Sequence, residues 1–469
     1  MNQKIRFSLN NKPLEVDCRA DMTVLEWLRG EALLRGTKEG CAEGDCGACS
    51  VLVSRSGPEH KGAPDWVPAN SCIMLMGQLD GGALVTVEGL AECGPDGHAV
   101  QARMAENGSS QCGFCTPGIV VALTGLLDRN NRPEEQDIHD ALAGNLCRCT
   151  GYRPIVEAVQ AAASDSPKRL PRPKKAGSSA TAGGDGSQIL QPGNLRELTG
   201  LLTRHRNATL LAGGTDISID VAHAKARWPK IISTRCVEEL RNLSATREGL
   251  TIGAAVTWEE ILPAVQKKWP SLATLVRRFG SVQVRSMGTI GGNLATASPI
   301  GDGAPGLIAL SAEIILASSK GERTMPLEDF FRDYRKTALR RGEVIRSVFI
   351  PAGSKDMRVY KVSKRYDQDI STVCGAFNLR VAKGHVADVR IAFGGMAATP
   401  VRARKAEKFL TGKRLESDTV DEACRILGEE FTPMTDMRGD AAYRSMVAAN
   451  LFHRYIAELS GETVEVMAL

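Results

Sequence analysis

The 469-residue sequence lacks a hydrophobic run long enough to cross a membrane as a helix, which takes about 18 to 20 apolar residues. Its best apolar stretch, residues 306–317, is interrupted by Glu313. No apolar core of a secretory signal follows Met1, because the first residues alternate between polar and apolar side chains. We therefore expect a cytosolic protein without a membrane partner, in which cysteine thiols stay reduced.

The sequence also has little histidine and little net charge. The seven histidines show no metal-ligand spacing, which argues against a histidine-based metal site. The net charge of +5 is too small to indicate nucleic-acid binding, so no nucleic-acid partner is expected. This charge is unevenly distributed, because residues 1–163 carry 14 basic and 21 acidic side chains whereas residues 188–469 are net +9.

Hydrophobic periodicity divides the chain into parts of different secondary structure. Residues 1–90 begin with a β-hairpin pattern and predict a small mixed sheet crossed by one helix, and residues 91–163 are helical in pattern. Residues 164–187 are rich in Pro, Lys, Gly and Ser without apolar periodicity, which is typical of a flexible linker. Strands and helices alternate over residues 188–352, and strand patterns precede amphipathic helices over residues 353–469. The sequence therefore predicts a multidomain α+β protein.

Ten of the 13 cysteines lie at or before Cys149, and eight of them form two groups. The first group has C-x4-C-x2-C spacing at Cys41, Cys46 and Cys49, with Cys72 as a distant fourth candidate. This is the plant-type [2Fe–2S] spacing, in which a tight loop wraps the cluster and the fourth thiolate comes from elsewhere in the fold. Glycines in the loop let the backbone pass close to the inorganic sulfides. A zinc site favours paired C-x2-C units instead.

The second group consists of two cysteine pairs, Cys112 with Cys115 and Cys147 with Cys149. Each pair stands near the start of a predicted helix, where a proline suits the first turn and the positive helix end stabilises thiolates. On spacing alone, a zinc site remains open. The ferredoxin-type loop in the same chain makes a second [2Fe–2S] cluster the better interpretation.

Two glycine-rich stretches follow the linker. Residues 210–217 run from an apolar strand into Gly213-Gly214, and adjacent glycines can present backbone N–H donors to a phosphate. The stretch lacks the G-x-G-x-x-G spacing of a Rossmann site, so an ordinary turn remains open on this signal alone. The second stretch, residues 286–302, is also rich in glycine and strengthens the prediction of a phosphate-binding loop.

Together these motifs resemble the iron–sulfur and FAD domains of the molybdenum hydroxylases, the family of xanthine dehydrogenase and aldehyde oxidase. The residues flanking the cysteines that share the resemblance are Glu43, Gly44, Gly47, Gln111, Gly113 and Arg148. The resemblance implies a β-grasp ferredoxin-like domain, an all-α [2Fe–2S] domain, and an α+β FAD-binding domain with a C-terminal α+β subdomain. The thiolate ligands that it implies are Cys41, Cys46, Cys49, Cys72, Cys112, Cys115, Cys147 and Cys149.

The same resemblance implies an FAD site in the glycine-rich half. It assigns the pyrophosphate to residues 210–217 and 289–293, the ribityl–adenylate portion to Asp302, and one flavin ring face to Phe279. The implied cofactor-binding residues, of which the last two match positions near the isoalloxazine, are Leu210, Leu211, Ala212, Gly213, Gly214, Thr215, Asp216, Ile217, Phe279, Thr289, Ile290, Gly291, Gly292, Asn293, Thr296, Asp302, Ile345 and Lys361.

The domain order of the family implies a role in electron transfer. The pattern is that of the small subunit of bacterial xanthine dehydrogenases, whose molybdenum–molybdopterin cofactor lies on a separate large subunit in an expected α2β2 heterotetramer. Electrons from the oxidation of hypoxanthine or xanthine to urate would pass through two [2Fe–2S] clusters to FAD and then to NAD+. Gln111 is expected near the partner's pterin, with Cys149 as the nearest thiolate, and no catalytic residue is expected beyond the FAD contacts.

Two alternatives stay open. The same subunit would serve an aldehyde or another N-heterocycle hydroxylase equally well, because substrate selection belongs to the molybdenum chain. An alternative of another class is a non-enzymatic zinc or redox-sensing binding protein with a vestigial flavin loop.

Overall fold

The computed structural model describes residues 2–54, 66–94, 97–165, 167, 169–173, 188–353 and 356–462. The chain forms two compact units. Unit 1 comprises Met1–Arg241, Thr257–Glu260 and Gly280–Thr289, and unit 2 comprises Asn242–Val256, Ile261–Phe279 and Ile290–Leu469. The linker expected at residues 164–187 lies mostly outside the described residues.

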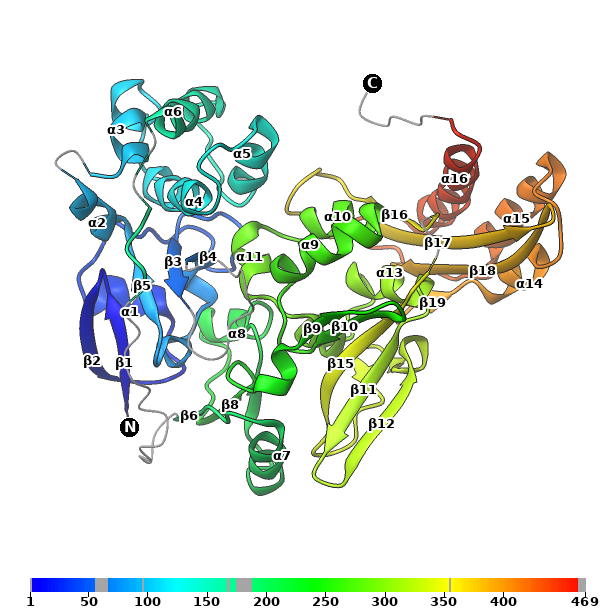
Figure 1. The fold of residues 1–469 in the computed structure, drawn as a ribbon, viewed down its shortest axis with the longest axis horizontal. Helices are drawn as coiled ribbons and strands as arrows, with labels where there is room; N and C mark the ends of the chain where they lie inside the picture. The colour runs from blue at the N-terminus through cyan, green and yellow to red at the C-terminus, as the bar shows by residue number, and fades with distance from the viewer. Residues whose placement is uncertain are drawn as a thin grey trace. The chain divides into compact units, whose positions relative to one another are not determined.

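Unit 1 begins with a five-stranded mixed sheet crossed by one helix, as the sequence predicts (blue in Figure 1). The strand order is β2-β1-β5-β3-β4, in which β1 and β5 are parallel and the other pairs antiparallel. Asn10 and Asn11 take positive φ in the hairpin turn, and Thr23 accepts a hydrogen bond from Glu26 N–H to start the helix. The elements are β1 (Gln3–Leu9), β2 (Lys12–Cys18), α1 (Val24–Gly30), β3 (Ser50–Ser54), β4 (Val67–Asn70) and β5 (Ala83–Val85).

The following part of unit 1 is helical and has its own core. The central helix is α4, which is buried from Gly118 to Leu127 and is covered by the apolar faces of its neighbours. One of those helices buries Ile138, Ala141 and Leu142, whose spacing of three and four residues is that of an apolar stripe. The helices are α2 (Val87–Leu90), α3 (Ala99–Glu106), α4 (Thr116–Arg129), α5 (Glu135–Leu142) and α6 (Arg153–Ser164).

Unit 1 also contains a small parallel sheet from the region expected to bind FAD. Its strand order is β6-β8-β7, with the bounds β6 (Gln188–Leu190), β7 (Thr209–Leu211) and β8 (Lys230–Ser233). Ile189 and Leu211 of this sheet share a buried cluster with Ala20 and Leu75 of the first domain. Residues 188–352 are therefore divided between the two units, because this sheet completes its core on the ferredoxin-like part. The helices that connect its strands are α7 (Leu195–Arg204) and α8 (Ser218–Ala222), and the segment Gly280–Thr289 of unit 1 contributes α11 (Val282–Met287).

Unit 2 contains two larger antiparallel sheets and a two-stranded one, in which β13 (Phe331–Asp333) pairs with β14 (Lys336–Thr337). The first has the order β12-β11-β15-β10-β9, with the bounds β9 (Leu243–Ala245), β10 (Gly249–Gly253), β11 (Glu313–Ser318), β12 (Gly321–Pro326) and β15 (Val344–Pro351). The second has the order β16-β17-β18-β19, with the bounds β16 (Arg358–Val362), β17 (Val373–Ala382), β18 (His385–Gly394) and β19 (Val401–Arg402). Between β17 and β18, Lys383 and Gly384 take positive φ in the turn that the sequence predicts. The α+β fold class is thus confirmed in both units.

Helices cover the second sheet and close its core. The long helix α16 carries Phe452 and Tyr455, and the Tyr455 ring stacks on Phe377 of β17 with a 5.3 Å centroid separation. The helices of the unit, including α16, are α9 (Trp258–Lys268), α10 (Pro270–Arg277), α12 (Ile290–Thr296), α13 (Gly303–Ala309), α14 (Arg404–Leu410), α15 (Ser417–Glu430) and α16 (Ala441–Leu459). The first turn of α9 belongs to unit 1. In the described part of the chain, no helix combines the length and apolarity that a membrane crossing demands.

His98 makes the stability of the helical part dependent on pH. It precedes α3, where its Nδ1 accepts the N–H of Val100, and it is almost fully buried. Burial lowers the pKa of His98 from 6.5 to about 4. Between these two pH values the unfolded chain binds a proton that the folded chain does not, so stability is complete above pH 6.5 and falls as the pH drops toward 4.

We expect this loss to reach about 3 kcal/mol at pH 4, at about 1.4 kcal/mol per pH unit. Denaturant unfolding between pH 7 and pH 4 measures it. His98→Asn keeps a helix-capping acceptor but does not titrate, so its unfolding free energy should lose this part of the pH dependence. His139→Asn, an exposed substitution in the neighbouring helix α5, is the control and should behave like the wild type. An unchanged pH profile in His98→Asn would contradict the assignment.

Candidate cofactor sites

The first cysteine group comes together around the loop that follows α1. The Sγ atoms of Cys49 and Cys72 lie 3.3 Å apart, and the thiol of Cys41 is hydrogen-bonded to those of Cys46 and Cys72. Cys72 is brought to the loop by a single 3-10 turn, Ser71–Ile73, directly after β4. Two thiolates about 2.3 Å from one tetrahedral ion lie about 3.8 Å apart, so the Cys49–Cys72 distance fits a shared metal. All four predicted ligands of this group are therefore assembled.

The loop backbone is folded around the sulfur of Cys41. The N–H groups of Glu43, Asp45 and Cys46 point at this Sγ from 3.5, 3.3 and 3.3 Å. The pKa of the Cys41 thiol is lowered by hydrogen bonds from Cys46, from Cys72 and from this backbone, which favours the thiolate that an iron requires. A Cβ at Gly40 would lie 2.7 Å from Cys46 Sγ, so the absence of a side chain there leaves room for this sulfur beside the backbone.

The second cysteine group forms two pairs. The thiol of Cys149 is hydrogen-bonded to Cys112, and that of Cys115 to Cys147. Burial raises the pKa of Cys115 to about 12, with the neighbouring thiol of Cys147 as the second cause. Cys112 and Cys149 are exposed, whereas Cys115 and Cys147 are partly buried. One pair thus faces outward and the other faces the core of the helical part.

A tyrosine that the sequence pattern does not reveal holds the loop of the second group. The hydroxyl of Tyr152 accepts the N–H of Cys147 at 2.8 Å and donates to the carbonyl of Asn145 at 2.9 Å. Tyr152 itself takes a φ of +67°, a strained value for a residue other than glycine. Such strain persists where the surroundings over-determine the backbone, and here the two hydrogen bonds do so.

The two cysteine loops interlock through glycines and a buried asparagine. A Cβ at Gly47 would lie 2.0 Å from the carbonyl oxygen of Gly144, and one at Gly118 would lie 2.2 Å from that of Gly47. Asn145 donates to the Gly47 carbonyl at 2.9 Å and accepts from Gln283 at 2.8 Å. The N–H of Leu146 donates to the carbonyl of the ligand Cys46 at 3.0 Å. The two groups are therefore held at a fixed separation within unit 1.

The thiol arrangement fits iron–sulfur clusters. Within the described ranges, no group of three or more His, Cys, Asp and Glu side chains is arranged to hold one metal ion. A [2Fe–2S] cluster instead needs two thiolates on each of two irons, so pairs are the relevant unit. Each group supplies two pairs, and the first adds backbone N–H donors of the kind that stabilise cluster sulfur.

The first glycine-rich loop joins β7 to α8 in unit 1. Gly214 takes a φ of +82°, and a Cβ at Gly213 would lie 2.1 Å from the carbonyl oxygen of Met287. The loop thus packs closely against Met287, which lies at the start of the second glycine-rich stretch and in the same unit. The two adjacent glycines carry no side chains that could cover their backbone N–H groups, which is compatible with a bound pyrophosphate. The side chain of Leu211, one of the predicted cofactor-binding residues, lies in the core, so only its backbone is available to a ligand.

The remaining predicted FAD residues lie in unit 2. Ile290, Gly291, Gly292, Asn293 and Thr296 are on α12, Phe279 follows α10, and Ile345 is buried on β15. Gly291 is packed tightly, because a Cβ there would lie 2.6 Å from the side chain of Ala254. Ile290 is also fully buried, so its side chain serves the core.

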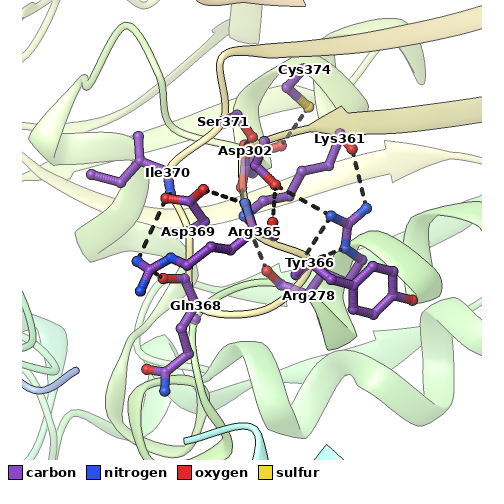
Figure 2. A network of polar contacts seen from close by, with 12 residues as sticks. Arg278, Asp302, Lys361, Arg365, Tyr366, Gln368, Asp369, Ile370, Ser371 and Cys374 are labelled. Carbon is purple, nitrogen blue, oxygen red and sulfur yellow. Dashed lines mark hydrogen bonds and ion pairs between the residues drawn. The ribbon is translucent and has the colours of Figure 1, made fainter. Parts of the chain in front are cut away.

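Asp302 and Lys361 form a buried ion pair, as Figure 2 shows. The ammonium of Lys361 lies 2.8 Å from the Asp302 carboxylate and also donates to the carbonyl of Arg278. Ser371 donates to the other carboxylate oxygen of Asp302. The sequence interpretation gave these two residues separate roles in the cofactor site, and it missed that they neutralise each other. Ser371 and Arg278 carried no sequence signal.

An internally bonded loop borders this ion pair (Figure 2). The guanidinium of Arg278 lies 4.3 Å from the ring centroid of Tyr366 and donates to its carbonyl at 3.0 Å. Asp369 accepts the N–H groups of Arg365 and Ile370. Its carboxylate is thus engaged in holding the loop.

Four protein-family models match the chain. They are described as a 2Fe-2S iron-sulfur cluster binding domain (residues 7–77), a [2Fe-2S] binding domain (residues 86–160), an FAD binding domain in molybdopterin dehydrogenase (residues 185–353) and a CO dehydrogenase flavoprotein C-terminal domain (residues 358–459).

Curated relatives match nearly the whole chain. A xanthine dehydrogenase of Emericella nidulans is 32% identical over 96% of this chain and 38% of its own length. A xanthine dehydrogenase/oxidase of Gallus gallus is 30% identical over 97% of this chain and 40% of its own. The chain therefore spans about two-fifths of the length of these relatives.

Solved structures match somewhat more than half of the chain. A carbon monoxide dehydrogenase chain from Hydrogenophaga pseudoflava has a TM-score of 0.55 at 29% identity and covers 59% of this chain and 98% of its own length. A chain of quinoline 2-oxidoreductase from Pseudomonas putida 86 has a TM-score of 0.54 at 28% identity, with 58% and 96% coverage.

The hydrogen bonds of Tyr152 should matter for metal retention at the second cysteine group. Tyr152→Phe leaves the Cys147 N–H and the Asn145 carbonyl without their partner, at a cost of about 1 to 3 kcal/mol. We expect iron to leave the second group roughly 5 to 100 times faster when a chelator is added, while the first group keeps its iron. Electron paramagnetic resonance of the reduced protein distinguishes the two. Tyr443→Phe, on the exposed face of α16, is the control, and equal iron loss from both variants would contradict the role.

Proposed function

Because the chain carries the two [2Fe–2S] domains and the FAD-binding domains of the molybdenum hydroxylase family, we propose that it conducts electrons from a molybdenum cofactor on another polypeptide to FAD and then NAD+. The observation that carries the proposal is the assembly of all eight predicted thiols into two four-membered groups, interlocked within one compact unit. When bound, the clusters would pass electrons one at a time, and FAD would collect two of them for transfer to NAD+.

Exposure of the cysteines supports a direction for this transfer. Cys112 and Cys149 of the second group are exposed, as is Gln111 beside them. Cys49 and Cys72 of the first group are buried and lie against Ile219 of α8, which follows the first glycine-rich loop. We propose that the partner with its molybdopterin docks at the exposed group, beside Gln111, and that the buried group serves the flavin.

In this proposal, the residues between the two cysteine groups hold the clusters close together, so that the electron path is short. Leu146 links the ligands Cys46 and Cys147 through one hydrogen bond and one peptide bond. Asn145 and Gln283 are almost fully buried beside the closely packed glycines. Hydrogen bonds to sulfur and the local charge would tune the potential of each cluster.

For the substrate, we propose hypoxanthine and xanthine, oxidised to urate on a large molybdopterin-binding subunit in an α2β2 assembly. Support comes from the xanthine dehydrogenases that match 96% and 97% of this chain. An aldehyde oxidase of Cavia porcellus at 30% identity and the quinoline 2-oxidoreductase likeness keep an aldehyde or another N-heterocycle as the second candidate. The zinc-binding alternative has less support, because both cysteine groups match [2Fe–2S] domain models.

The composition of the purified chain tests the electron-transfer role. We expect iron–sulfur and flavin absorption bands, with about four iron atoms and one FAD per chain, as eight thiolates and one flavin site require. Cys49→Ser and Cys147→Ser should each remove the signal of one cluster and leave the other. Cys236→Ser, outside both groups, is the matched control. A colourless protein that contains zinc would overturn the proposal.

The acceptor and substrate are tested on the complex with the molybdenum chain. We expect xanthine-dependent reduction of NAD+ to proceed at least tenfold faster than the reaction with an aldehyde or quinoline, or with dioxygen in place of NAD+. A preference for aldehyde or quinoline would favour the second candidate. A preference for dioxygen would reject NAD+ as the acceptor.

A further inference from the structure

Gln78 connects the ferredoxin-like domain to the first glycine-rich loop. Its side chain is 2% exposed. The amide Nε2 donates to the carbonyl of Gly213 at 3.2 Å, and the Oε1 accepts the N–H of Leu75 at 2.9 Å. These two partners determine which end of the Gln78 amide is which. The Gly213 carbonyl can only accept, so the amide NH2 faces it, and the Leu75 N–H can only donate, so the amide oxygen faces that group.

The position of Gln78 is itself held by surrounding contacts within unit 1. The guanidinium of Arg235, which follows β8, donates to the Gln78 carbonyl. Leu75 is fully buried in the cluster that joins the parallel sheet to the ferredoxin-like part, together with Leu211 of the strand leading into the loop. Gln78 also lies six residues after Cys72, so the same short segment supplies a thiol and this contact.

The hydrogen bond to Gly213 determines where the loop directs its donors. In a trans peptide the C=O and the following N–H point in opposite directions, and the described chain contains no cis peptide. A donor on the Gly213 carbonyl therefore turns the N–H of Gly214 away from Gln78. Two glycines in succession have no preferred φ of their own, so an external contact must select the orientation. Met287, which would clash with any Cβ at Gly213, restricts the loop from another side.

We propose that Gln78 is a positioning residue for FAD: by holding the Gly213–Gly214 peptide plane, it makes the ferredoxin-like domain pre-organise the pyrophosphate loop. This inference rests on the proposed FAD-binding function. It adds that the affinity for FAD is partly set by a residue of the iron–sulfur domain. A pre-organised loop binds more tightly because the ordering cost does not fall on the binding step.

Two substitutions at Gln78 separate positioning from mere packing. Gln78→Met keeps the volume but removes both hydrogen bonds, and it should weaken FAD binding about tenfold, the effect of losing a buried hydrogen bond. Gln78→Glu keeps the acceptor for Leu75 but at high pH has no donor for Gly213. The introduced carboxyl regains a donor when it is protonated. The Gln78→Glu variant should therefore release FAD rapidly at pH 8, and its release rate should fall to near that of the wild type at pH 5.5.

Gln3→Met is the matched control. Gln3 is buried at the same junction and accepts the N–H of Ile189 on β6, but it does not touch the glycine-rich loop. It should lose stability as Gln78→Met does, while its FAD affinity stays within twofold of the wild type. Because His98 also makes stability depend on pH, the wild type and Gln3→Met are measured at each pH.

FAD release is followed by the rise of flavin fluorescence, with the iron content of every sample as a measure of intact folding. Tenfold weaker binding in Gln78→Met, or pH rescue in Gln78→Glu where the methionine variant does not fold, supports the proposal. FAD binding in both variants within twofold of the wild type and of Gln3→Met, without pH rescue, overturns it. A wild-type chain that takes up no FAD at all would instead reject the proposed function.

Discussion

The close approach of backbones at Gly47 is the constraint on which much of unit 1 depends. There the loop of the first cysteine group touches the segment before the second, at a distance that leaves no room for a methyl group. A buried network of Asn145, Gln283 and Ser50 supplies a hydrogen bond to the Gly47 carbonyl, which this contact removes from water. Buried polar networks of this kind specify one arrangement, because any shift leaves a donor or acceptor without its partner.

The two cysteine groups depend both on the local spacing of their ligands and on contacts between residues that are far apart in the sequence. The ligands themselves were predictable, because thiolates that bind one cluster must come from short loops with recognisable spacing. The glycines were predictable because a loop that wraps a cluster passes close to sulfur atoms and leaves no room for side chains. Gly40 is an example, since it lies against Cys46 Sγ. Gly47 has a different reason, because its neighbour is the carbonyl of Gly144, almost a hundred residues away in the sequence. No pattern within a loop announces a contact of that kind.

The side chains that hold the two cysteine groups and the glycine-rich loop in place could not be identified from the sequence. Tyr152, Asn145 and Gln78 are ordinary polar residues whose roles depend on partners brought near by folding. The fold class followed from periodicity, since alternation and helical spacing report burial directly. The division of the flavin region between the two units did not follow, because it depends on the sheet β6-β8-β7 sharing a core with Leu75 and Ala20. The hydrophobic pattern of a helix or strand indicates which of its faces is buried, but it does not indicate which other element that face packs against.

The course of the chain between the units has a consequence for how the protein can be cut or divided. The backbone passes from one unit to the other five times, at residues 241/242, 256/257, 260/261, 279/280 and 289/290. A protease that nicks one of these crossings therefore leaves four covalent connections and releases neither unit. A truncation designed at residue 187 would keep both cysteine groups but strip Leu75 and Ala20 of the sheet that covers them. Gene fragments that respect the sequence order of the domains would thus expose apolar surface and aggregate, whereas the intact chain buries it.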